Sequence, residues 1–258
     1  MQSEARSLAG RVALVSGASG WIGSGIARQL ADAGAKVAVN YFHDDAAAGR
    51  TVKSIVDAGG TAIAVKGDIT DKVAAIDLAN RISAELGSVD LLINNAINSG
   101  VPHGPIEEQE WEHYLGHLEF CVKAPLLLLK AVLAGMKARG FGRVINIGSE
   151  AFDLADPRNG QYIASKGAML GATRSWANEL GRFGITVNVV APGWIAADRH
   201  GFDGTVPTPA LADYIESLPL GRVGTPDDVG AMVSFLCSEA AGFVTGQRIY
   251  VNGGKTLV

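Results

Sequence analysis

The sequence predicts a single doubly wound α/β domain with a mainly parallel, seven-stranded sheet and helices on both faces. Three observations predict it. Short β-branched or apolar runs recur along the chain, segments with helical periodicity separate them, and the alternation reaches the C-terminus without a low-complexity linker or short repeat. Strands that are apolar on both faces and alternate with helices are typical of a parallel sheet covered on each side. We therefore treat residues 1–258 as one domain.

Seven runs predict the strands. They are "RVALVS" (11–16), "KVAVNY" (36–41), "TAIAVKGDI" (61–69), "DLLINNA" (90–96), "RVINIGS" (143–149), "ITVNVVAPG" (185–193) and "RIYVNGG" (248–254). Between them lie helical patterns such as "IGSGIARQLADAG" (22–34), with apolar residues every three or four positions and a glycine stop. The run "APLLLLKAVLAGM" (124–136) predicts a buried helix, because Lys130 interrupts it and it is too short to span a bilayer.

One long stretch lacks both patterns. Residues 193–217, "GWIAADRHGFDGTVPTPALADYIES", are rich in glycine and proline and follow a predicted strand. Ligands bind at the carboxyl ends of strands in open α/β sheets, so this segment is predicted to be a substrate lid. Trp194, Arg199, His200 and Phe202 are candidates for shaping substrate choice. They stay outside the predicted site, because an Arg or His in a loop is more often solvated than functional.

Composition narrows the function classes. Hydrophobic residues make up 48% of the chain and charged residues 19%, which is ample for a core. The net charge is −4 and the basic residues are scattered, so neither nucleic acid nor a membrane surface is the expected partner. Cys121 and Cys237 form no disulfide framework or metal-ligand spacing, and "MQSEARSLAGR" has no apolar signal segment. We expect a cytoplasmic protein without a metal site.

The stretch "ALVSGASGWIGSGIARQL" (13–30) predicts a strand, a tight turn and a helix start. Gly17, Gly20 and Gly23 lie where a backbone turns sharply, approaches a diphosphate and packs a helix on a strand. The helix N-terminus offers unpaired N–H groups and a partial positive charge to phosphates. Three glycines can also form a purely structural turn, but this strand-to-helix context favours nucleotide binding.

With this turn and the later motifs "NNAI" (94–97) and "APGWI" (191–195), the chain resembles the short-chain dehydrogenase/reductase family over nearly its whole length. It is most similar in pattern to the 3-oxoacyl-[acyl-carrier-protein] reductase type. The resemblance implies a Rossmann-type fold and an oxidoreductase that transfers a hydride between NAD(P)(H) and a small carbonyl/alcohol substrate. Similar members usually form tetramers through the regions that match residues 122–136 and 242–258, so we expect a homotetramer, with a dimer next.

The segment "GQYIASKGAML" (160–170) places Tyr162 and Lys166 on one helix face. Alone, the pair would suit any solvated helix. Ser149, thirteen residues before Tyr162 and just past a strand, has the separation that the resemblance requires of a catalytic serine. The resemblance makes Tyr162 the general acid/base, Lys166 its neighbouring charge and Ser149 the donor to the substrate oxygen. A phenol needs roughly 4 kcal/mol to donate near pH 7, and a charge about 4 Å away supplies about that much at an effective dielectric of about 20.

The resemblance also implies a set of cofactor contacts. Asp68 and Ile69 would flank the adenine, the "NNAI" motif would lie beside the ribose, and the backbone of Ile195 would meet the carboxamide. The full set is Gly17, Ser19, Gly20, Trp21, Ile22, Gly23, Tyr41, Phe42, Asp68, Ile69, Asn95, Ala96, Ile97, Tyr162, Lys166, Pro192, Gly193 and Ile195.

Cofactor preference depends on the end of the second strand. An acidic side chain there binds the ribose 2′-hydroxyl of NAD, and a basic one binds the 2′-phosphate of NADP. Tyr41 and Phe42 occupy the deciding positions, and Gly20 occupies the usual basic position of the turn. The "NY" ending resembles NADP-preferring members, whereas Asp44 and Asp45 would repel a 2′-phosphate if they pointed inward. We expect NADP(H) to be slightly favoured over NAD(H).

Several positions depart from the family pattern. Trp21 stands where the middle glycine of the turn is usual, and Ile97 where another glycine is usual. Cys121 matches an asparagine that helps to hold a proton-relay water, and a thiol is a weak hydrogen-bonding replacement. We interpret Cys121 as a small buried hydrophobe. Ala197 stands where a threonine is common. Glu150 could point toward the pocket, but a solvated loop carboxylate is the favoured expectation.

Two other functions stay open. The altered relay and cofactor positions would suit a nucleotide-binding regulator or scaffold that has lost turnover. The G-x-x-G-x-x-G spacing of the turn, which resembles a longer-chain branch of the family, would suit an isomerase or dehydratase. That branch carries an extra C-terminal substrate domain for which this chain has no room. An active oxidoreductase is favoured because Ser149, Tyr162 and Lys166 are all present.

Overall fold

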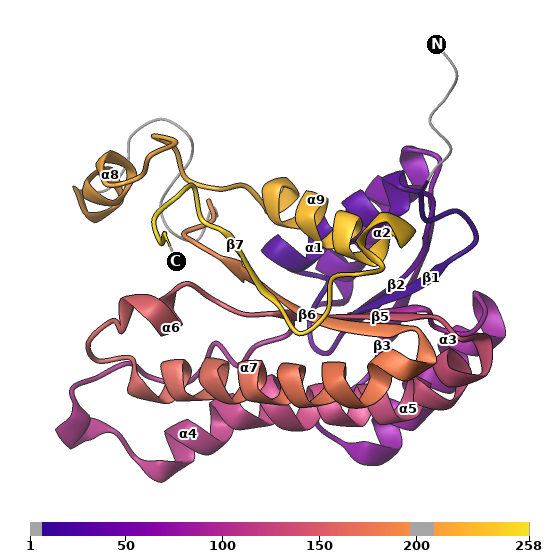
Figure 1. Ribbon diagram of the computed structural model, residues 1–258, viewed down its shortest axis with the longest axis horizontal. Coiled ribbons are helices and arrows are strands. Elements are labelled where there is room, and N and C mark those ends of the chain that lie inside the picture. Colours follow the sequence, from indigo (N-terminus) through magenta and orange to yellow (C-terminus); the bar gives the residue numbers. More distant parts are fainter. Residues whose placement is uncertain (1–6, 197–208, 258) are drawn as a thin grey trace.

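The computed structural model describes residues 7–196 and 209–257. Seven parallel strands form one sheet in the order β3-β2-β1-β4-β5-β6-β7. The strands are β1 (Val12–Val15), β2 (Lys36–Tyr41), β3 (Thr61–Lys66), β4 (Leu91–Asn94), β5 (Gly142–Ile147), β6 (Ile185–Pro192) and β7 (Arg248–Val251). From β1 the chain first adds β2 and β3 on one side and then adds β4 to β7 on the other side. The predicted doubly wound, Rossmann-type sheet is therefore confirmed (Figure 1).

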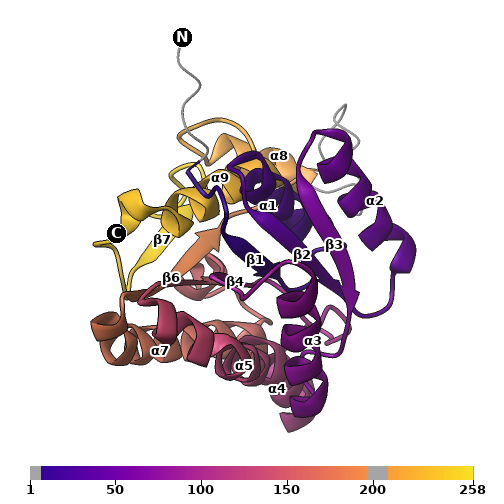
Figure 2. The same cartoon turned by 90° about the vertical axis from the view of Figure 1, so that its right-hand side faces the viewer.

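Helices cover both faces of the sheet. One face carries α1 (Trp21–Asp32), α2 (Asp45–Asp57) and α9 (Pro226–Cys237). The other carries α3 (Lys72–Glu85), α5 (Ala124–Arg139) and α7 (Gly160–Leu180), with α4 (Trp111–Leu118) beside α7 (Figure 1 and Figure 2). The short elements are α6 (Ala151–Leu154), α8 (Pro209–Glu216), the π-helical turn η2 (Glu119–Lys123), and the 3₁₀ turns η1 (Ile106–Glu108), η3 (Gly181–Phe183) and η5 (Glu239–Ala241).

Two apolar layers hold the helices to the sheet. Successive strand side chains point to opposite faces, so Ala13 and Val15 of β1 pack toward α1 and α9, whereas Val12 and Leu14 pack toward α3 and α5. All four are buried. Full burial of a Val or Leu side chain contributes roughly 1.5–3 kcal/mol, so the apolar character of both faces fixes the three-layer arrangement.

Buried polar side chains fix the position of α7 below the sheet. Asn94 at the end of β4 donates to Asn146 of β5 at 2.7 Å, and Asn146 donates to Thr173 of α7 at 2.8 Å. This chain of hydrogen bonds sets the height of α7 along the strands, and therefore the place of the side chains on its first turns.

The predicted apolar helix is confirmed as α5, which begins at Ala124 and ends before Gly140. Gly140 has φ 62°, the left-handed conformation that glycine adopts readily at a helix end. Leu128, Leu129 and Met136 are buried against the sheet, while Leu126 stays 40% exposed. Within the described ranges, no helix has the length and apolar character needed to cross a membrane.

Candidate active site

The predicted site residues gather at one edge of the sheet. Since all the strands run in parallel, their carboxyl ends lie at the same edge. The turn from Gly17 follows β1, Tyr41 ends β2, Asp68 follows β3, Asn95 follows β4, Ser149 follows β5 and Pro192 ends β6. Residues from six different strands thus meet where ligands bind in open α/β sheets.

The glycine-rich turn after β1 leaves no room for side chains at two positions. Gly17 has φ 63°, and a Cβ there would lie 2.9 Å from the Cα of Ala96. A Cβ on Gly23 would lie 2.4 Å from the carbonyl oxygen of Gly17. Gly20, by contrast, faces open space at the start of α1, where no side chain caps the helix. The exposed helix N-terminus and the tight cradle below it fit a dinucleotide diphosphate.

The loop after β4 fastens the turn in place. The side-chain amide of Asn95 donates to the carbonyl oxygens of Ser16 at 3.0 Å and Gly17 at 3.2 Å. The hydroxyl of Ser16 accepts from the backbone N–H groups of Asn95 and Ala96. Asn95 therefore shapes the cradle through its side chain, and the next residues, Ala96 and the exposed Ile97, line the edge of the crevice.

Trp21 stands where the family pattern has a glycine, and its backbone has a positive φ. Its φ is 25°, in a region that residues with a Cβ rarely adopt. Its indole Nε1 donates to the carbonyl oxygen of Ala196, in the segment that follows β6. The ring is half-buried and packs beside the core layer under α1. Trp21 thus links the glycine turn directly to the stem of the predicted lid.

The end of β2 gathers both acidic and basic groups. Asp44 turns away to cap α2, accepting from the N–H of Ala47 at 2.8 Å. Asp45 accepts from the Tyr41 hydroxyl at 2.9 Å and pairs with Lys66 at 3.1 Å. The hydrogen bond between them raises the pKa of Tyr41 and lowers that of Asp45. Phe42 is 49% exposed beside them.

The residues after β3 are held by local contacts. Asp68 accepts from both the backbone N–H of Thr70 at 2.8 Å and its hydroxyl at 2.7 Å, and Ile69 is buried. These two hydrogen bonds stabilise the turn that follows β3.

Tyr162 and Lys166 lie together on the first turns of α7. Lys166 is 7% exposed, its Nζ donates to the carbonyl oxygen of Ile147 at 2.7 Å, and it lies 5.4 Å from the centre of the Tyr162 ring. Ile147 is two residues before Ser149, so this bond ties α7 to the end of β5. Ser149 is half-buried there, and its Oγ accepts from the N–H of Ala151 at 3.1 Å. Lys166 therefore links the helix that carries Tyr162 to the strand that leads to Ser149.

Glu150 differs from its expected place. It is 6% exposed, not solvated, so that expectation is wrong. Its carboxylate accepts from the Tyr214 hydroxyl at 2.5 Å and from the side-chain amide of Asn252 at 3.0 Å. Burial raises the pKa of Glu150, and these two hydrogen bonds oppose the rise. Sequence reasoning missed this cluster because Tyr214 and Asn252 are distant in the chain.

The stem of the predicted lid is anchored by the same cluster. The N–H of Trp194 donates to the Tyr214 hydroxyl at 2.9 Å, which joins α8 to the end of β6. A Cβ on Gly193 would lie 2.7 Å from Asn252 and from that hydroxyl, so glycine is needed there. Ile195 is buried and pairs with Gly224 in a parallel bridge. Ala197, Arg199, His200 and Phe202 lie outside the described residues.

Cys121 is a buried thiol, as expected. It is 1% exposed within η2, and the Ser165 hydroxyl lies 3.4 Å from its sulfur. One turn earlier, His117 is also buried, and its ring meets the Tyr162 ring edge-on at 5.5 Å between centres. Sequence reasoning did not select His117, because its burial depends on contacts with other elements.

Known proteins match nearly the whole chain. A family model described as enoyl-(acyl carrier protein) reductase matches residues 17–256. An uncharacterized oxidoreductase of Methylorubrum extorquens is 39% identical over 248 residues, covering 96% of this chain and 98% of its own. The 3-oxoacyl-[acyl-carrier-protein] reductase FabG of Staphylococcus aureus is 34% identical over 254 residues, covering 95% and 98%. The protein belongs to the short-chain dehydrogenase/reductase family.

Two solved structures agree with the fold. A blue fluorescent protein from a metagenomic library, in complex with NADPH, has a TM-score of 0.86 and 35% identity and covers 97% of this chain and 100% of its own. A 7α-hydroxysteroid dehydrogenase, with NADH and 7-oxo glycochenodeoxycholic acid, has a TM-score of 0.89 and 34% identity and covers 98% and 97%. This short-chain dehydrogenase/reductase is an NAD(P)-dependent oxidoreductase that acts on carbonyl or CH–OH groups of small molecules.

The site contains no evident metal centre. In the described part of the chain, no group of three or more His, Cys, Asp or Glu side chains is placed to hold a metal ion. Among the described residues at this edge of the sheet, the Lys166 ammonium donates to the Ile147 carbonyl oxygen and the Lys66 ammonium pairs with Asp45.

Proposed function

We propose that Tyr162, Lys166 and Ser149 carry out reversible ketone reduction and secondary-alcohol oxidation in this oxidoreductase. The observation that carries the proposal is the placement of the Lys166 ammonium beside the Tyr162 ring, at the strand edge that also holds Ser149. A bound nicotinamide would supply or accept the hydride. Tyr162 would give its hydroxyl proton to the oxygen of the reduced carbonyl, and the Lys166 charge would stabilise the phenolate that is left.

The Ser149 hydroxyl suits an oxyanion donor. Its oxygen already accepts the Ala151 N–H, which leaves its proton free to point toward a substrate oxygen. Lys166 spends one of its three N–H donors on the Ile147 carbonyl, and two stay available for the ribose and for proton exchange. We also propose that the cofactor contacts predicted from the sequence bind the nicotinamide dinucleotide, and that the glycine cradle holds its diphosphate.

The experiment is a substrate survey with both reduced cofactors. Nicotinamide absorbance is followed with simple ketones, 3-oxoacyl thioesters and oxo-steroids, the last two being the substrate classes of the named relatives. Turnover with at least one ketone, and reversal with the matching alcohol, is expected. Tight cofactor binding without turnover across the whole survey would instead favour a regulator, and an isomeric product without net cofactor change would favour an isomerase.

We also propose that NADP(H) is preferred over NAD(H). The support is that both acidic residues near Tyr41 already have partners: Asp44 caps α2, and Asp45 pairs with Lys66. Their repulsion of a ribose 2′-phosphate is therefore reduced. Arg81 adds a second cation, donating to the backbone oxygen of Lys66 at 3.2 Å. The dissociation constant for NADPH is expected to be lower than that for NADH, and Lys66→Ala should narrow the difference. Equal affinities in the unaltered protein would contradict this preference.

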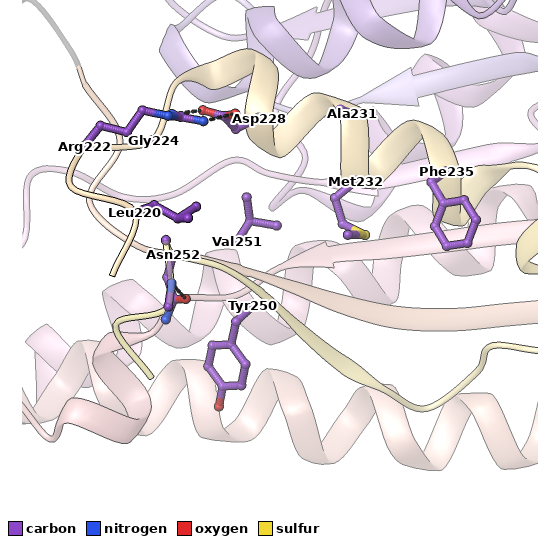
Figure 3. A pocket seen from close by; sticks show the side chains of 12 residues that line it. Leu220, Arg222, Gly224, Asp228, Ala231, Met232, Phe235, Tyr250, Val251 and Asn252 are labelled. Carbon is purple, nitrogen blue, oxygen red and sulfur yellow. Dashed lines mark hydrogen bonds and ion pairs between the residues drawn. The ribbon is translucent and has the colours of Figure 1, made fainter. Parts of the chain in front are cut away.

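We propose that the protein is a homotetramer in the cytoplasm. We also propose that each chain is a single domain and that residues 193–217 form its substrate lid. Apolar side chains support the assembly: Phe243 is fully exposed, and Leu220 and Phe235 border a cavity of about 520 Å³ between α9 and the edge strand β7 (Figure 3). Figure 3 shows Met232 and Val251 between them. Light scattering should give four chains, and Phe235→Asp should reduce that number. A monomer in solution would remove the proposal.

A further inference from the structure

A buried carboxylate stands directly after Ser149. Glu150 is 6% exposed, and its two carboxylate oxygens accept from the Tyr214 hydroxyl at 2.5 Å and from the Asn252 side-chain amide at 3.0 Å. Its backbone N–H donates to the carbonyl oxygen of Pro192 at 3.0 Å. Burying a carboxylate is unfavourable unless its oxygens are paired, and here two distant parts of the chain supply the partners. Glu150 therefore joins the Ser149 loop to the ends of β6 and β7 and to α8.

The Tyr214 hydroxyl extends this link to the segment that follows β6. It donates to Glu150 and accepts from the backbone N–H of Trp194 at 2.9 Å. A Cβ on Gly193 would lie 2.7 Å from the same oxygen, and the Tyr214 and Trp194 rings lie 5.3 Å apart between centres. Burial and the bond to Glu150 raise the pKa of Tyr214, so the hydroxyl keeps the proton that it donates. One hydroxyl thus fixes the backbone at residues 193 and 194 against Glu150.

Backbone hydrogen bonds to β6 hold Ser149 on both sides. The residue before it, Gly148, donates to the carbonyl oxygen of Val190 at 2.7 Å, and the residue after it donates to the end of β6. β6 continues directly into residues 193–195. The serine and this segment are therefore neighbours in the fold, and the hydrogen bonds through Tyr214 connect them a second time, from outside the sheet.

The two connected parts have different tasks under the proposed function. Ser149 would donate to the substrate oxygen, and Ile195 would contact the carboxamide of the nicotinamide. Hydride transfer requires the two reacting carbons to be held within about 3–3.5 Å of each other, and a displacement of about 1 Å can lower the rate about 100-fold. The position of segment 193–195 relative to the serine therefore bears directly on the rate.

We propose that Glu150 and Tyr214 are positioning residues for the reaction. Their hydrogen bond, continued to the Trp194 N–H, fixes segment 193–195 relative to Ser149 and so sets the distance over which the hydride moves. The inference rests on the proposed function for the tasks of the serine and of the segment. The effect of these hydrogen bonds on the backbone can be measured apart from turnover, because both join residues of this chain.

The test compares Tyr214→Phe with Tyr250→Phe. Both variants lose one hydrogen bond from a tyrosine hydroxyl to a carboxylate in the segment after Ser149, since Tyr250 donates to Asp153 at 2.6 Å. Tyr214→Phe also removes the hydroxyl that accepts from the Trp194 N–H, and the control does not. We expect kcat to fall about 10- to 100-fold in Tyr214→Phe and to stay within about twofold of the unaltered rate in Tyr250→Phe.

Two kinetic readouts separate positioning from a merely structural role. The primary isotope effect on kcat with NADPH deuterated at C4 should rise in Tyr214→Phe, because hydride transfer becomes slower than the other steps. The dissociation constant for NADPH should change by less than about threefold, since the diphosphate cradle is untouched. An unchanged kcat in the folded variant, or an equal fall in Tyr250→Phe, would overturn the inference.

Glu150→Gln and Glu150→Leu test the other end of the hydrogen bond. Gln keeps an oxygen that can accept from the Tyr214 hydroxyl, whereas Leu has none. The Gln variant should keep most of the unaltered kcat, and the Leu variant should lose as much as Tyr214→Phe does. Equal turnover in the two variants would contradict the positioning role, and Tyr214→Phe decides the question if the Leu variant does not fold.

Amide hydrogen exchange, followed without added cofactor, gives a readout apart from activity. The Trp194 N–H should exchange about tenfold faster or more in Tyr214→Phe and at an unaltered rate in Tyr250→Phe, because only the first variant removes its acceptor. Unaltered exchange in Tyr214→Phe would overturn the inference. Tyr162→Phe distinguishes the two failures: turnover that survives in that variant defeats the proposed function itself, whereas its loss, with Tyr214→Phe fully active, defeats only the positioning.

Discussion

The glycine turn and the α4–α7 contact each depart from the family pattern at one position, and the two departures are accommodated differently. At the turn, Trp21 keeps the positive φ that a glycine would adopt, and its side chain gains a bond to Ala196. At the helix contact, Cys121 stands where the family pattern has an asparagine, and one turn away the ring nitrogens of buried His117 form no hydrogen bond with any described residue. At the turn, Trp21 itself adopts the positive φ that the backbone needs, at a cost in backbone strain. At the helix contact, the thiol of Cys121 instead keeps only a weak contact, with the Ser165 hydroxyl 3.4 Å from its sulfur.

Within the two regions compared, the largest expected effect concerns the positions at which the glycine turn has no spare space. Gly23→Ala places a Cβ 2.4 Å from the Gly17 carbonyl oxygen, so the cradle must shift. Overpacking of this kind costs about 1–3 kcal/mol, and we expect NADPH affinity to fall by about 10- to 100-fold. Isothermal titration and urea unfolding measure both effects.

Gly20→Ala is the matched control for that variant. The same methyl group enters open space at a residue with φ −112°, so the stability of the protein should stay close to that of the unaltered chain. Equal losses in the two variants would mean that the turn is sensitive to any added side chain and that the cradle geometry is not the cause.

The next effect is the change in stability and NADPH affinity when Trp21 is replaced. Trp21→Phe keeps a residue with a Cβ at positive φ and loses the indole bond, so it should destabilise the protein by about 1 kcal/mol. Trp21→Gly also loses the bond, but it relieves backbone strain of about 1–3 kcal/mol and restores the family residue. We expect its NADPH affinity to stay within about threefold of the unaltered chain. Thermal melts and cofactor titrations check both statements, and a Trp21→Gly protein that no longer binds cofactor would contradict them.

Prediction from sequence succeeded where periodicity or local spacing carried the information. The seven strands and the helix from Ala124 follow from apolar patterns, and the meeting of Tyr162 with Lys166 follows from helical spacing. It failed at Glu150, whose burial depends on Tyr214 and Asn252, 64 and 102 positions away in the chain. It passed over His117, because the burial of that ring is created by α7 and by the loop after β4. Such contacts leave no periodic signal in a single sequence.

The last pair of expected effects concerns two opposite dependences of stability on pH. Unfolded His117 binds a proton below its ordinary pKa of 6.5, whereas the folded protein resists protonation to about 4, so this residue removes stability as the pH falls across that range. Glu150 has a raised pKa, so the folded protein holds a proton that the unfolded chain releases above 4.5, and this residue removes stability as the pH rises from there.

Two substitutions separate these dependences. In His117→Phe, the free energy of unfolding should fall less as the pH is lowered from 6.5 to about 4. In Glu150→Gln, it should fall less as the pH is raised above 4.5. Urea unfolding at a series of pH values records both. A single slope shared by all three proteins would show that neither group titrates differently in the folded state.

The measurement that tests the account most directly is the turnover of Tyr162→Phe with a ketone that the unaltered enzyme reduces, together with its NADPH dissociation constant. The account predicts that kcat falls by about 10²–10⁴-fold while the dissociation constant changes by less than about threefold, since the variant loses only the proton donor. Turnover that survives the loss of the phenol hydroxyl would contradict the assignment of the chemistry to Tyr162 and Lys166.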